Sequence, residues 1–546
     1  MERKWWMEQI GYQIYPKSFK DTNNDGIGDI PGNIEKLDYL QELGVTLLWI
    51  CPVYDSPMFD NGYDISNYEG IWPTFGTMED MDTLIQEAKK RGISLMMDLV
   101  VNHCSDQHEW FQQAIKDKNS KYRNYFIFKK GIDGKLPCNW RSVFGGSVWE
   151  PVPGEEDTYY YHTFAKQQPD LNWECPELRQ EIIDMINRWL ERGITGYRVD
   201  AINFIKKGEF IDREPDGADG LANCFDLMRN VPGIEEFYAQ LRHEAFDLHE
   251  CATVSETVGV GYDIIDTVVG EKGCFSMMFD FNYTNLDVEN EEYFRRRDWT
   301  VDEFKKAIYL SQKEIQKVGW SSPFFENHDL PRSIQKNIKD EEYQNEIGAK
   351  ALGVLFFHLR GTPFIYQGQE LGMPNAIRSS IDEFDDLNAH SMYQRSLQEG
   401  FSEEESLRFV NLRSRDNART SMPWSNAPYG GFSSVEPWIK MNETYPTINV
   451  ENQINDPNSV FSFYKQMIQL RKDNVETLVY GLFEEYDCGN QEVISYSRNG
   501  DKKFIILVNL SKEEQKINSV DGKIVLNNYD TFDNTLKPYQ AIVVEA

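Results

Sequence analysis

The sequence predicts an α/β fold: a (β/α)8 TIM barrel with a subdomain inserted after the third strand and an all-β domain at the C-terminus. Short apolar strands alternate with amphipathic helices along most of the chain, as in parallel sheets with helical crossovers. Four of these strands run directly into acidic residues. After about residue 475 only short alternating segments follow, which predicts a β-sandwich domain over residues 475–546.

The first part of the barrel, residues 1–103, contains three predicted strands and two helices. Apolar residues recur at helical spacing in the second helix, and a glycine, Gly44 or Gly92, follows each helix as a C-terminal stop. The predicted strands are 10–15, 45–50 and 93–97, and the helices are 33–43 and 79–91.

Residues 104–175 interrupt the alternation. The segment is rich in aromatic residues, glycine and charge, and it has no strong helical period after Lys121. It is far too long for a strand-to-helix loop, so we expect an inserted subdomain, domain B.

The barrel resumes over residues 176–474. Pro176 suits the first position of a helix, and Gly193 suits its end. A long excursion, about 371–457, precedes the last helix at 460–471. The remaining predicted strands are 195–199, 251–255, 275–281, 322–325 and 363–368.

Composition limits the function classes. A net charge of −33 argues against nucleic acid or an anionic membrane as partner. The 8 cysteines show no zinc spacing, and the sequence has neither a signal-peptide pattern nor an apolar run of membrane length. These features predict a cytoplasmic protein, a monomer or weak homo-oligomer, that acts on a small molecule.

The acidic strand ends point to chemistry. In a closed barrel the C-terminal ends of all strands open on one face, so Asp98, Asp200, Glu256 and the segment 326–329 are expected to meet there. Arg198 and Asp200 point the same way on their strand, and the guanidinium should keep this carboxylate ionised as a nucleophile. A plain salt bridge is the alternative, but the recurrence of acidic strand ends favours function.

Glu256 has the complementary setting. It lies in an apolar stretch, where desolvation raises a carboxyl pKa, as a general acid requires. An ionised and a protonated carboxyl group together can hydrolyse a glycoside. Asp329, beside His328, could hold two sugar hydroxyls while positive charge develops on the ring.

Residues 21–29 form a second candidate site. Oxygen-bearing side chains stand at alternate positions, and Gly26 permits a sharp turn, as in the front half of an EF-hand loop. The twelfth position is Gly32 rather than Glu, which argues against a paired-helix calcium sensor. A turn with solvated acids is the alternative.

The four acidic blocks, Asp98–His103, Gly196–Asp200, Glu256 and Glu326–Asp329, resemble in order and spacing those of the α-amylase superfamily, glycoside hydrolase family 13. Gln168–Asn172 resembles the fifth block of its oligo-1,6-glucosidase and α-glucosidase branch. The resemblance implies a retaining enzyme with Asp200 as nucleophile, Glu256 as acid/base and Asp329 as transition-state stabiliser.

The resemblance also implies a substrate pocket and a metal. Tyr63 and Phe164 would stack on sugar, His103 and His328 would donate to hydroxyls, and Arg415 would pair with Asp60 to close the pocket. One structural Ca²⁺ and no organic cofactor are implied, with Ca²⁺ or Mg²⁺ left open. The expected metal ligands are Asp21, Asn23, Asp25, the Ile27 carbonyl and Asp29. The expected substrate-binding residues are Asp60, Tyr63, His103, Phe144, Phe164, Arg198, Glu326, His328 and Arg415.

The expected activity is release of terminal glucose from short α-glucosidic oligosaccharides, α-1,6 before α-1,4. Ala201, after the expected nucleophile, leaves linkage preference open, because in the resembled branch Val there accompanies α-1,6 specificity. The alternatives are a glucosyl-transferring relative (a sucrose isomerase or trehalose-type enzyme), a phospho-disaccharide hydrolase, and a non-catalytic carbohydrate-binding protein.

Overall fold

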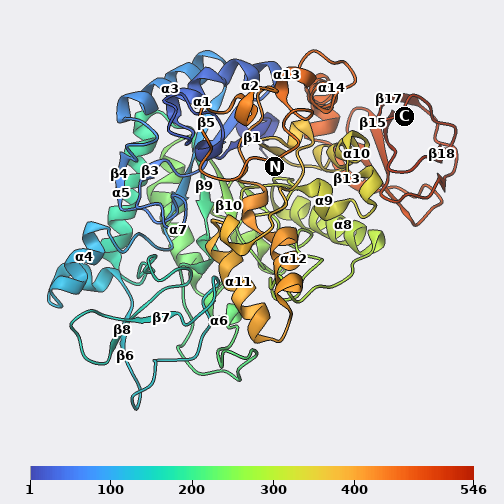
Figure 1. Ribbon diagram of the computed structural model, residues 1–546. Helices are drawn as coiled ribbons and strands as arrows, with labels where there is room; N and C mark the ends of the chain where they lie inside the picture. The colour runs from blue at the N-terminus through green and yellow to red at the C-terminus, as the bar shows by residue number, and fades with distance from the viewer. Residues whose placement is uncertain (1) are drawn as a thin grey trace.

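The barrel is built on seven parallel strands in the order β11-β10-β9-β5-β2-β1-β12 (Figure 1). A computed structural model describes residues 2–546 of the chain. The strands are β1 (Gly11–Ile14), β2 (Leu47–Ile50), β5 (Ser94–Val100), β9 (Gly196–Asp200), β10 (Ala252–Glu256), β11 (Met277–Phe279) and β12 (Phe364–Tyr366).

The ring closes where the sequence predicts a strand at 322–325, although this segment is not a regular strand. Ser322 donates its N–H to the Met278 carbonyl (2.9 Å), and Phe364 donates to the Pro323 carbonyl (3.1 Å). The segment therefore bridges β11 and β12. Pro323 has no N–H to donate, which explains why the hydrogen-bond ladder is broken here.

Helices surround the strands. The helix expected at 33–43 is two helices that meet at Lys36. Pro176 begins α5, and Gly193 ends it in a left-handed conformation (φ 119°). The surrounding helices are α1 (Ile30–Glu35), α2 (Leu37–Leu43), α3 (Met78–Lys90), α5 (Pro176–Arg192), α7 (Ile234–Glu244), α8 (Val301–Val318), α10 (Glu346–Phe357) and α14 (Val460–Asp473).

The chain between β5 and α5 forms α4 (Glu109–Lys116) and an antiparallel sheet of β6 (Phe128–Lys130), β8 (Thr158–Tyr161) and β7 (Trp149–Pro151). Trp140 and Trp149 form a small core with Phe204 and Cys224. The loop that follows β9 therefore packs into the inserted region. The domain bounds 104–175 remain a prediction.

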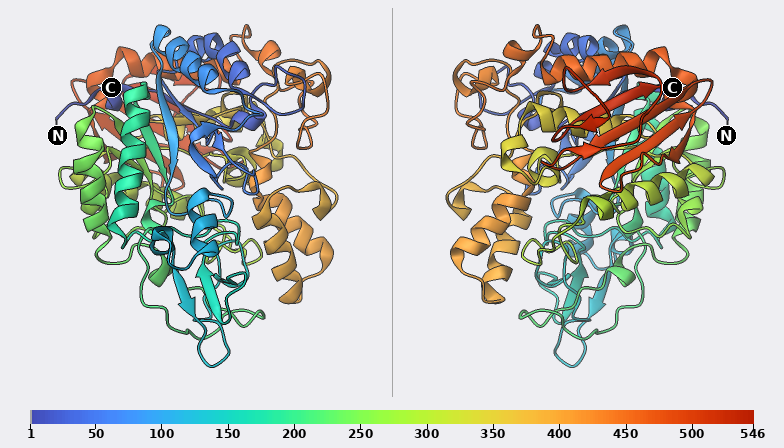
Figure 2. Two further views of the ribbon diagram at one scale, coloured as in Figure 1. Left: turned by 90° about the vertical axis from the view of Figure 1, so that its left-hand side faces the viewer. Right: turned by 90° about the vertical axis from the view of Figure 1, so that its right-hand side faces the viewer.

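The excursion at 371–457 contains three α-helices that the sequence analysis did not predict: α11 (Leu387–Gln398), α12 (Glu403–Arg413) and the short α13 (Val450–Gln453). A capping box of Ser402 and Glu405 begins α12. Figure 2 shows α11, α12 and the inserted sheet extending from the same end of the barrel. They frame the face on which the acidic strand ends open.

The C-terminal segment forms a five-stranded antiparallel sheet, on the right of Figure 1. Tyr496 donates its hydroxyl to the Leu355 carbonyl (2.7 Å) and so joins the sheet to α10. In order across the sheet the strands are β13 (Leu482–Glu485), β14 (Val493–Asn499), β15 (Lys503–Asn509), β19 (Ala541–Glu545) and β17 (Lys523–Asn527).

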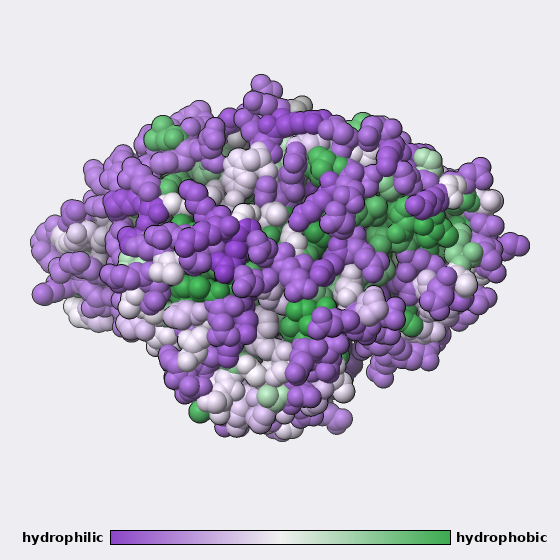
Figure 3. Space-filling view, turned by 90° about the horizontal axis from the view of Figure 1, so that it is seen from above, coloured by the Kyte–Doolittle hydropathy of each residue, from purple (hydrophilic) through white to green (hydrophobic). Residues whose placement is uncertain are grey.

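Hydrophilic side chains cover most of the face seen from above, with apolar groups scattered among them (Figure 3). This agrees with the strongly acidic composition, which keeps a solvated surface. Within residues 2–546, no helix combines the length and apolar character needed to cross a bilayer.

A buried ion pair holds the inserted region against the barrel. Lys207 Nζ lies 2.7 Å from Asp170 Oδ2, and these side chains are 6% and 0% exposed. Lys207 also donates to Asn102 Oδ1 (3.1 Å), just beyond β5. Asp170 accepts from the Thr163 hydroxyl and N–H, both at 2.6 Å. Three separate segments therefore meet at one ammonium group.

Replacement of this ammonium is predicted to be costly. Lys207→Ala leaves the Asp170 carboxylate buried without its cation, so we expect a loss of about 3–5 kcal/mol in denaturant unfolding. Lys206→Ala is the matched control, because its partner Glu174 is 64% exposed, and should cost about 0–1 kcal/mol. Equal losses in the two variants would contradict this reading.

Candidate active site

A cavity of about 180 Å³ opens at the C-terminal ends of the strands. Nine of the predicted site residues line it: Asp60, Tyr63, His103, Phe144, Phe164, Asp200, Glu256, Asp329 and Arg415. They come from strand ends, the loop after β2, the inserted region and the excursion, so the fold brings together residues more than 350 positions apart, such as Asp60 and Arg415.

Arg198 lies beneath the cavity and binds three carboxylates. Its Nη1 lies 2.8 Å from Asp98 Oδ1 and 2.6 Å from Asp200 Oδ1, and its Nη2 lies 2.9 Å from Glu256 Oε2. The arginine is 1% exposed. Because Asp200 and Glu256 share one guanidinium, they lie side by side in one cavity.

Ala201 links the same two acids through the backbone. It follows β9 in a left-handed conformation (φ 43°, ψ 30°), and its N–H donates to Glu256 Oε2 (2.9 Å). Residues with a Cβ adopt this conformation at a cost of about 1–3 kcal/mol. The turn thus directs a backbone donor at Glu256 directly after Asp200.

The charge state of Asp200 differs from the sequence expectation, which considered Arg198 alone. Burial raises the pKa of Asp200 well above its usual range; Arg198 opposes this rise, and Glu256 and Asp98 add to it. One guanidinium does not balance three acidic side chains, so Asp200 holds its proton more firmly than an exposed aspartate does.

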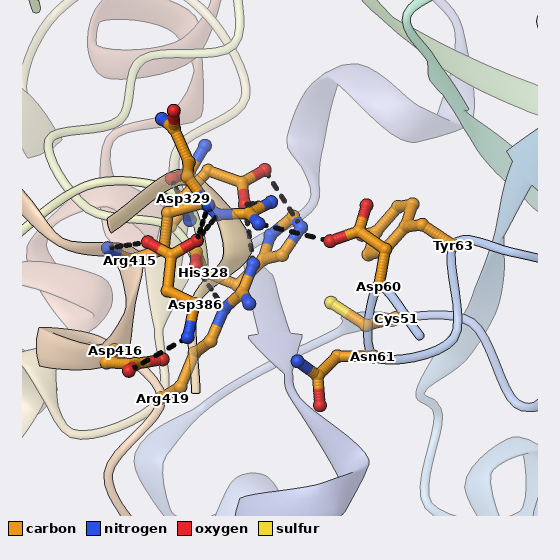
Figure 4. A network of polar contacts seen from close by, with 12 residues as sticks. Cys51, Asp60, Asn61, Tyr63, His328, Asp329, Asp386, Arg415, Asp416 and Arg419 are labelled. Atoms are coloured by element: carbon orange, nitrogen blue, oxygen red, sulfur yellow. Dashed lines mark hydrogen bonds and ion pairs between the residues drawn. The ribbon is translucent and has the colours of Figure 1, made fainter. Parts of the chain in front are cut away.

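Asp329, by contrast, is surrounded by cations (Figure 4). Arg419 Nη2 lies 2.9 Å from its Oδ1, Arg415 Nη1 lies 3.5 Å from the same atom, and His328 Nε2 lies 3.0 Å from Oδ2. Burial opposes ionisation, but His328 and the two arginines hold the pKa of Asp329 well below its usual range. This carboxylate is therefore permanently charged.

His328 supports Asp329 from behind and does not line the cavity. Its ring stacks on Tyr63, with centroids 5.1 Å apart and planes 6° from parallel. Burial lowers the pKa of His328, but Asp329 and Cys51 outweigh this and raise it to about 10. His328 is thus a charged support for Asp329.

One end of the cavity is closed by a chain of ion pairs. Arg415 Nη2 binds Asp60 Oδ1 at 3.0 Å, and its Nε binds Asp386 Oδ1 at 2.8 Å (Figure 4). Gln168 donates to Asp60 Oδ2 (3.1 Å) and lies 3.2 Å from His103 Nε2. Burial lowers the pKa of His103, which keeps this imidazole neutral. Asp386 and Gln168 were not among the predicted site residues.

Aromatic side chains form one wall. Phe164 lies edge-on to His103, with ring centroids 5.2 Å apart, and Phe144 lies 5.5 Å from Phe164. The Arg415 guanidinium sits 4.7 Å above the Phe144 ring. These rings, tilted by 55° to each other, offer separate apolar faces beside the ion pairs of the cavity.

Besides His328, two further predicted contact residues do not line the cavity. Arg198 lies beneath the acids, and Glu326 is not among the lining residues. The Glu326 carboxylate accepts from the N–H (2.9 Å) and hydroxyl (2.5 Å) of Ser333 and lies 3.1 Å from Arg332. Substrate contact by Glu326 stays a prediction; in this structure its carboxylate holds the following turn and helix.

The open side of the cavity was missed by the sequence analysis. No periodic pattern marks its residues, which come from the loop after β11 and from the excursion. They are Asn285, Glu291, Tyr293, Asn388 and Arg413.

The loop at 21–29 folds around its carboxylates. Asp21 accepts from the N–H groups of Asn23 (3.0 Å) and Gly26 (2.9 Å), and Asp29 caps α1 by accepting from Gly32 N–H (2.6 Å). The Asn23 and Asp25 side chains are exposed. Across residues 2–546 no three His, Cys, Asp or Glu side chains converge as a metal site. The potential donor atoms of the loop are all oxygens, which suit a hard cation. They belong to the carboxylates, the Asn23 side-chain amide and a backbone carbonyl.

Comparison with known proteins gives consistent matches. A family model described as the alpha-amylase catalytic domain matches residues 13–481. The chain is 41% identical over 562 residues to an oligo-1,6-glucosidase of Parageobacillus thermoglucosidasius, covering 100% of this chain and 99% of that protein. It is 40% identical over 528 residues to a glucan 1,6-alpha-glucosidase of Streptococcus pneumoniae, covering 96% and 94%.

Solved structures match over the full length. A trehalose-6-phosphate hydrolase of Bacillus licheniformis superposes with a TM-score of 0.90 at 37% identity, covering 100% of both chains. An isomaltulose synthase of Protaminobacter rubrum superposes with a TM-score of 0.93 at 38% identity, again covering 100% of both.

The ion pair of His328 and Asp329 predicts a pH dependence. The pKa of His328 is raised from 6.5 to about 10, so the pair's stabilisation is complete below pH 6.5 and is lost as pH rises through about 10. Asp329→Asn removes the carboxylate that pairs with His328. The difference in unfolding free energy between this variant and the unmodified protein should therefore shrink as pH rises from 6.5 to about 10. NMR titration should find His328 charged at pH 8 only when Asp329 is present; neutral His328 at pH 8 in both proteins would contradict the assignment.

Proposed function

Because this chain belongs to the alpha-amylase family of glycoside hydrolases, we propose that it is a retaining, exo-acting α-glucosidase of short oligosaccharides. It would release terminal glucose, from α-1,6 linkages first and α-1,4 linkages second. The observation that carries the proposal is the Arg198 guanidinium that joins Asp200 (2.6 Å) and Glu256 (2.9 Å) at the cavity floor.

The proposed reaction uses this pair in two steps. Asp200 attacks the anomeric carbon while Glu256 gives its proton to the leaving oxygen, and water activated by Glu256 then releases glucose from Asp200. The first step requires a carboxylate at Asp200 and a carboxylic acid at Glu256. Acids close enough to share one side chain favour retention, which needs a short separation.

The Arg415–Asp60 pair (3.0 Å) supports exo action, because an ion pair across the cavity would block further sugar units beyond a terminal ring. Its polar groups suit hydroxyls at the far side of that ring. Asp329, held ionised by its cations, would bind two hydroxyls and stabilise positive charge on the ring during bond cleavage. Tyr63 and Phe164 would offer stacking surfaces.

The charge of the cavity favours neutral substrates. Five carboxylates line it (Asp60, Asp200, Glu256, Glu291 and Asp329) against two guanidiniums. An anionic sugar would meet net repulsion, which speaks against the phospho-disaccharide alternative. Relatives named oligo-1,6-glucosidase and glucan 1,6-alpha-glucosidase support the α-1,6 preference.

A structural Ca²⁺ and a cytoplasmic location belong to the same proposal. Asp21, Asn23, Asp25, the Ile27 carbonyl and Asp29 would hold the ion, which would brace the loop before α1 and take no part in the chemistry. All 8 cysteines are free thiols, which suits a reducing compartment.

The acid/base role predicts a leaving-group dependence. Glu256→Gln should lower kcat/KM for isomaltose by about 10²–10⁴-fold, because the leaving sugar needs a proton. Aryl α-glucosides with acidic phenols should lose much less. Product analysis with isomaltose, maltose, sucrose and trehalose 6-phosphate tests the substrate at the same time.

Other results would overturn the proposal. Equal losses on both substrates would remove Glu256 from the acid role. Isomerised products from sucrose, or turnover of trehalose 6-phosphate ahead of isomaltose, would favour the glucosyl-transferring or phospho-disaccharide alternatives. Absence of turnover on every substrate would leave a carbohydrate-binding protein.

The metal proposal predicts that Ca²⁺ added after EDTA treatment raises the melting temperature. At a free Ca²⁺ concentration of 100 times Kd, the free energy of unfolding should rise by about 2.7 kcal/mol. Asp25→Ala should remove most of this gain. Its side chain is exposed, so the variant should fold; Asp38→Ala, at another exposed acid, is the control. A gain that persists in Asp25→Ala would locate the ion elsewhere, and no gain in the unmodified protein would exclude it.

A further inference from the structure

The loop after β11 ends in a tight hairpin at the open side of the cavity. Val288 and Arg296 form an antiparallel bridge, and Glu292 N–H donates to the Glu289 carbonyl (3.0 Å). Between them Asn290 (φ 52°) and Glu291 (φ 62°) both have left-handed backbone angles. Two central residues with positive φ define a type I′ turn.

Glu291 is an unusual residue for the second central position, where this turn strongly prefers glycine after asparagine. A residue with a long side chain is held in this conformation at a cost of about 1–3 kcal/mol. Asn290 suits the first position, so the misfit is confined to Glu291. The side chain at this position lines the catalytic cavity.

The Glu291 carboxylate is oriented by a cation from another loop. Its Oε1 lies 3.0 Å from Arg229 Nη1, and the Arg229 guanidinium sits 4.2 Å above the Phe225 ring. Within residues 2–546 no hydrogen bond joins Oε2 to another protein group. The side chain is 33% exposed and borders both the main cavity and a smaller one beside Asn388.

The neighbouring residue fixes the hairpin in place. Glu292 is 4% exposed and binds Arg395 Nη2 of α11 at 2.5 Å, with Arg141 of the inserted region at 3.9 Å. Arg295 of the same hairpin also pairs with Glu292. The turn is therefore anchored to both structures that frame the cavity, and Glu291 is presented at a defined position.

We propose that Glu291 determines specificity for the leaving group, by accepting hydroxyl hydrogen bonds from a neutral sugar in the open half of the cavity. This inference rests on the proposed glucosidase function. Arg415 and Asp60 pair across one wall of the cavity, and Glu291 lines the same cavity away from that pair, where its carboxylate could meet a leaving group. A charged acceptor there attracts sugar hydroxyls and repels an anionic leaving group.

The test compares a leaving group that carries hydroxyls with one that does not. We expect Glu291→Gly to lower the ratio of kcat/KM for isomaltose to kcat/KM for p-nitrophenyl α-glucoside by about tenfold or more, as for loss of a charge-assisted hydrogen bond. The melting temperature should not fall, because glycine relieves the strained turn. Glu291→Gln, which retains the side-chain length, should lower the ratio less.

Glu289→Gln is the matched control, an exposed acid in the same turn. The ratio of kcat/KM for isomaltose to kcat/KM for p-nitrophenyl α-glucoside should be the same in this variant as in the unmodified protein. A ratio in Glu291→Gly within twofold of the unmodified value, or a parallel loss on both substrates, would overturn the assignment and leave Glu291 as a brace for Arg229. If the unmodified protein hydrolysed neither substrate, the proposed function itself would fail.

Discussion

One buried guanidinium determines much of this molecule. Arg198 satisfies carboxylates from three adjacent strands, β5, β9 and β10, and the strand register places Asp98 directly opposite it. Bringing an arginine and three acidic side chains together out of water is expensive, and Coulomb attraction repays the cost only when every partner is in place. The site and the barrel therefore stabilise each other: a slipped register would bury unpaired acids, and a missing acid would leave Arg198 unbalanced. The same excess of acidic side chains raises the pKa of Asp200.

The second constraint is the attachment of the inserted region and the excursion to the strand ends around Arg198. The inserted region is joined to the barrel by the buried Lys207–Asp170 pair, and the excursion is joined to it by Arg415, which reaches both Asp60 and Asp386. Arg415 and Asp60 are 355 positions apart, whereas Asp386 belongs to the excursion itself and orients Arg415. The cavity walls are consequently as well determined as the strand ends, although loops build them.

The sequence predicted the floor better than the walls. Strand ends could be recognised because apolar runs and the acids after them are local patterns. The seventh strand was misjudged as regular because Pro323 forms only part of its ladder. Glu326 was expected in the cavity because it begins an acidic block, yet Arg332 and Ser333 a few residues later hold its carboxylate. Helices α11 and α12 were missed although the Ser402–Glu405 capping box was visible. No periodic sequence pattern marks residues such as Asn285 and Asn388, so only the folded structure shows that they line the cavity.

The two ends of the cavity differ in how readily they can change. Around the Arg415–Asp60 pair, replacing Asp60, Asp329 or Arg415 would leave a buried charge without its partner. Such a change would lower both the catalytic rate and the stability of the fold. At the open end, the turn at 289–292 is held mainly by Glu292, and the residue beside it is strained already. A substitution there alters what the cavity contacts at little cost in stability. Proteins named oligo-1,6-glucosidase, trehalose-6-phosphate hydrolase and isomaltulose synthase all resemble this chain over its whole length. If the acids at the strand ends stay fixed while turns such as 289–292 change in sequence, one barrel can accept different leaving groups.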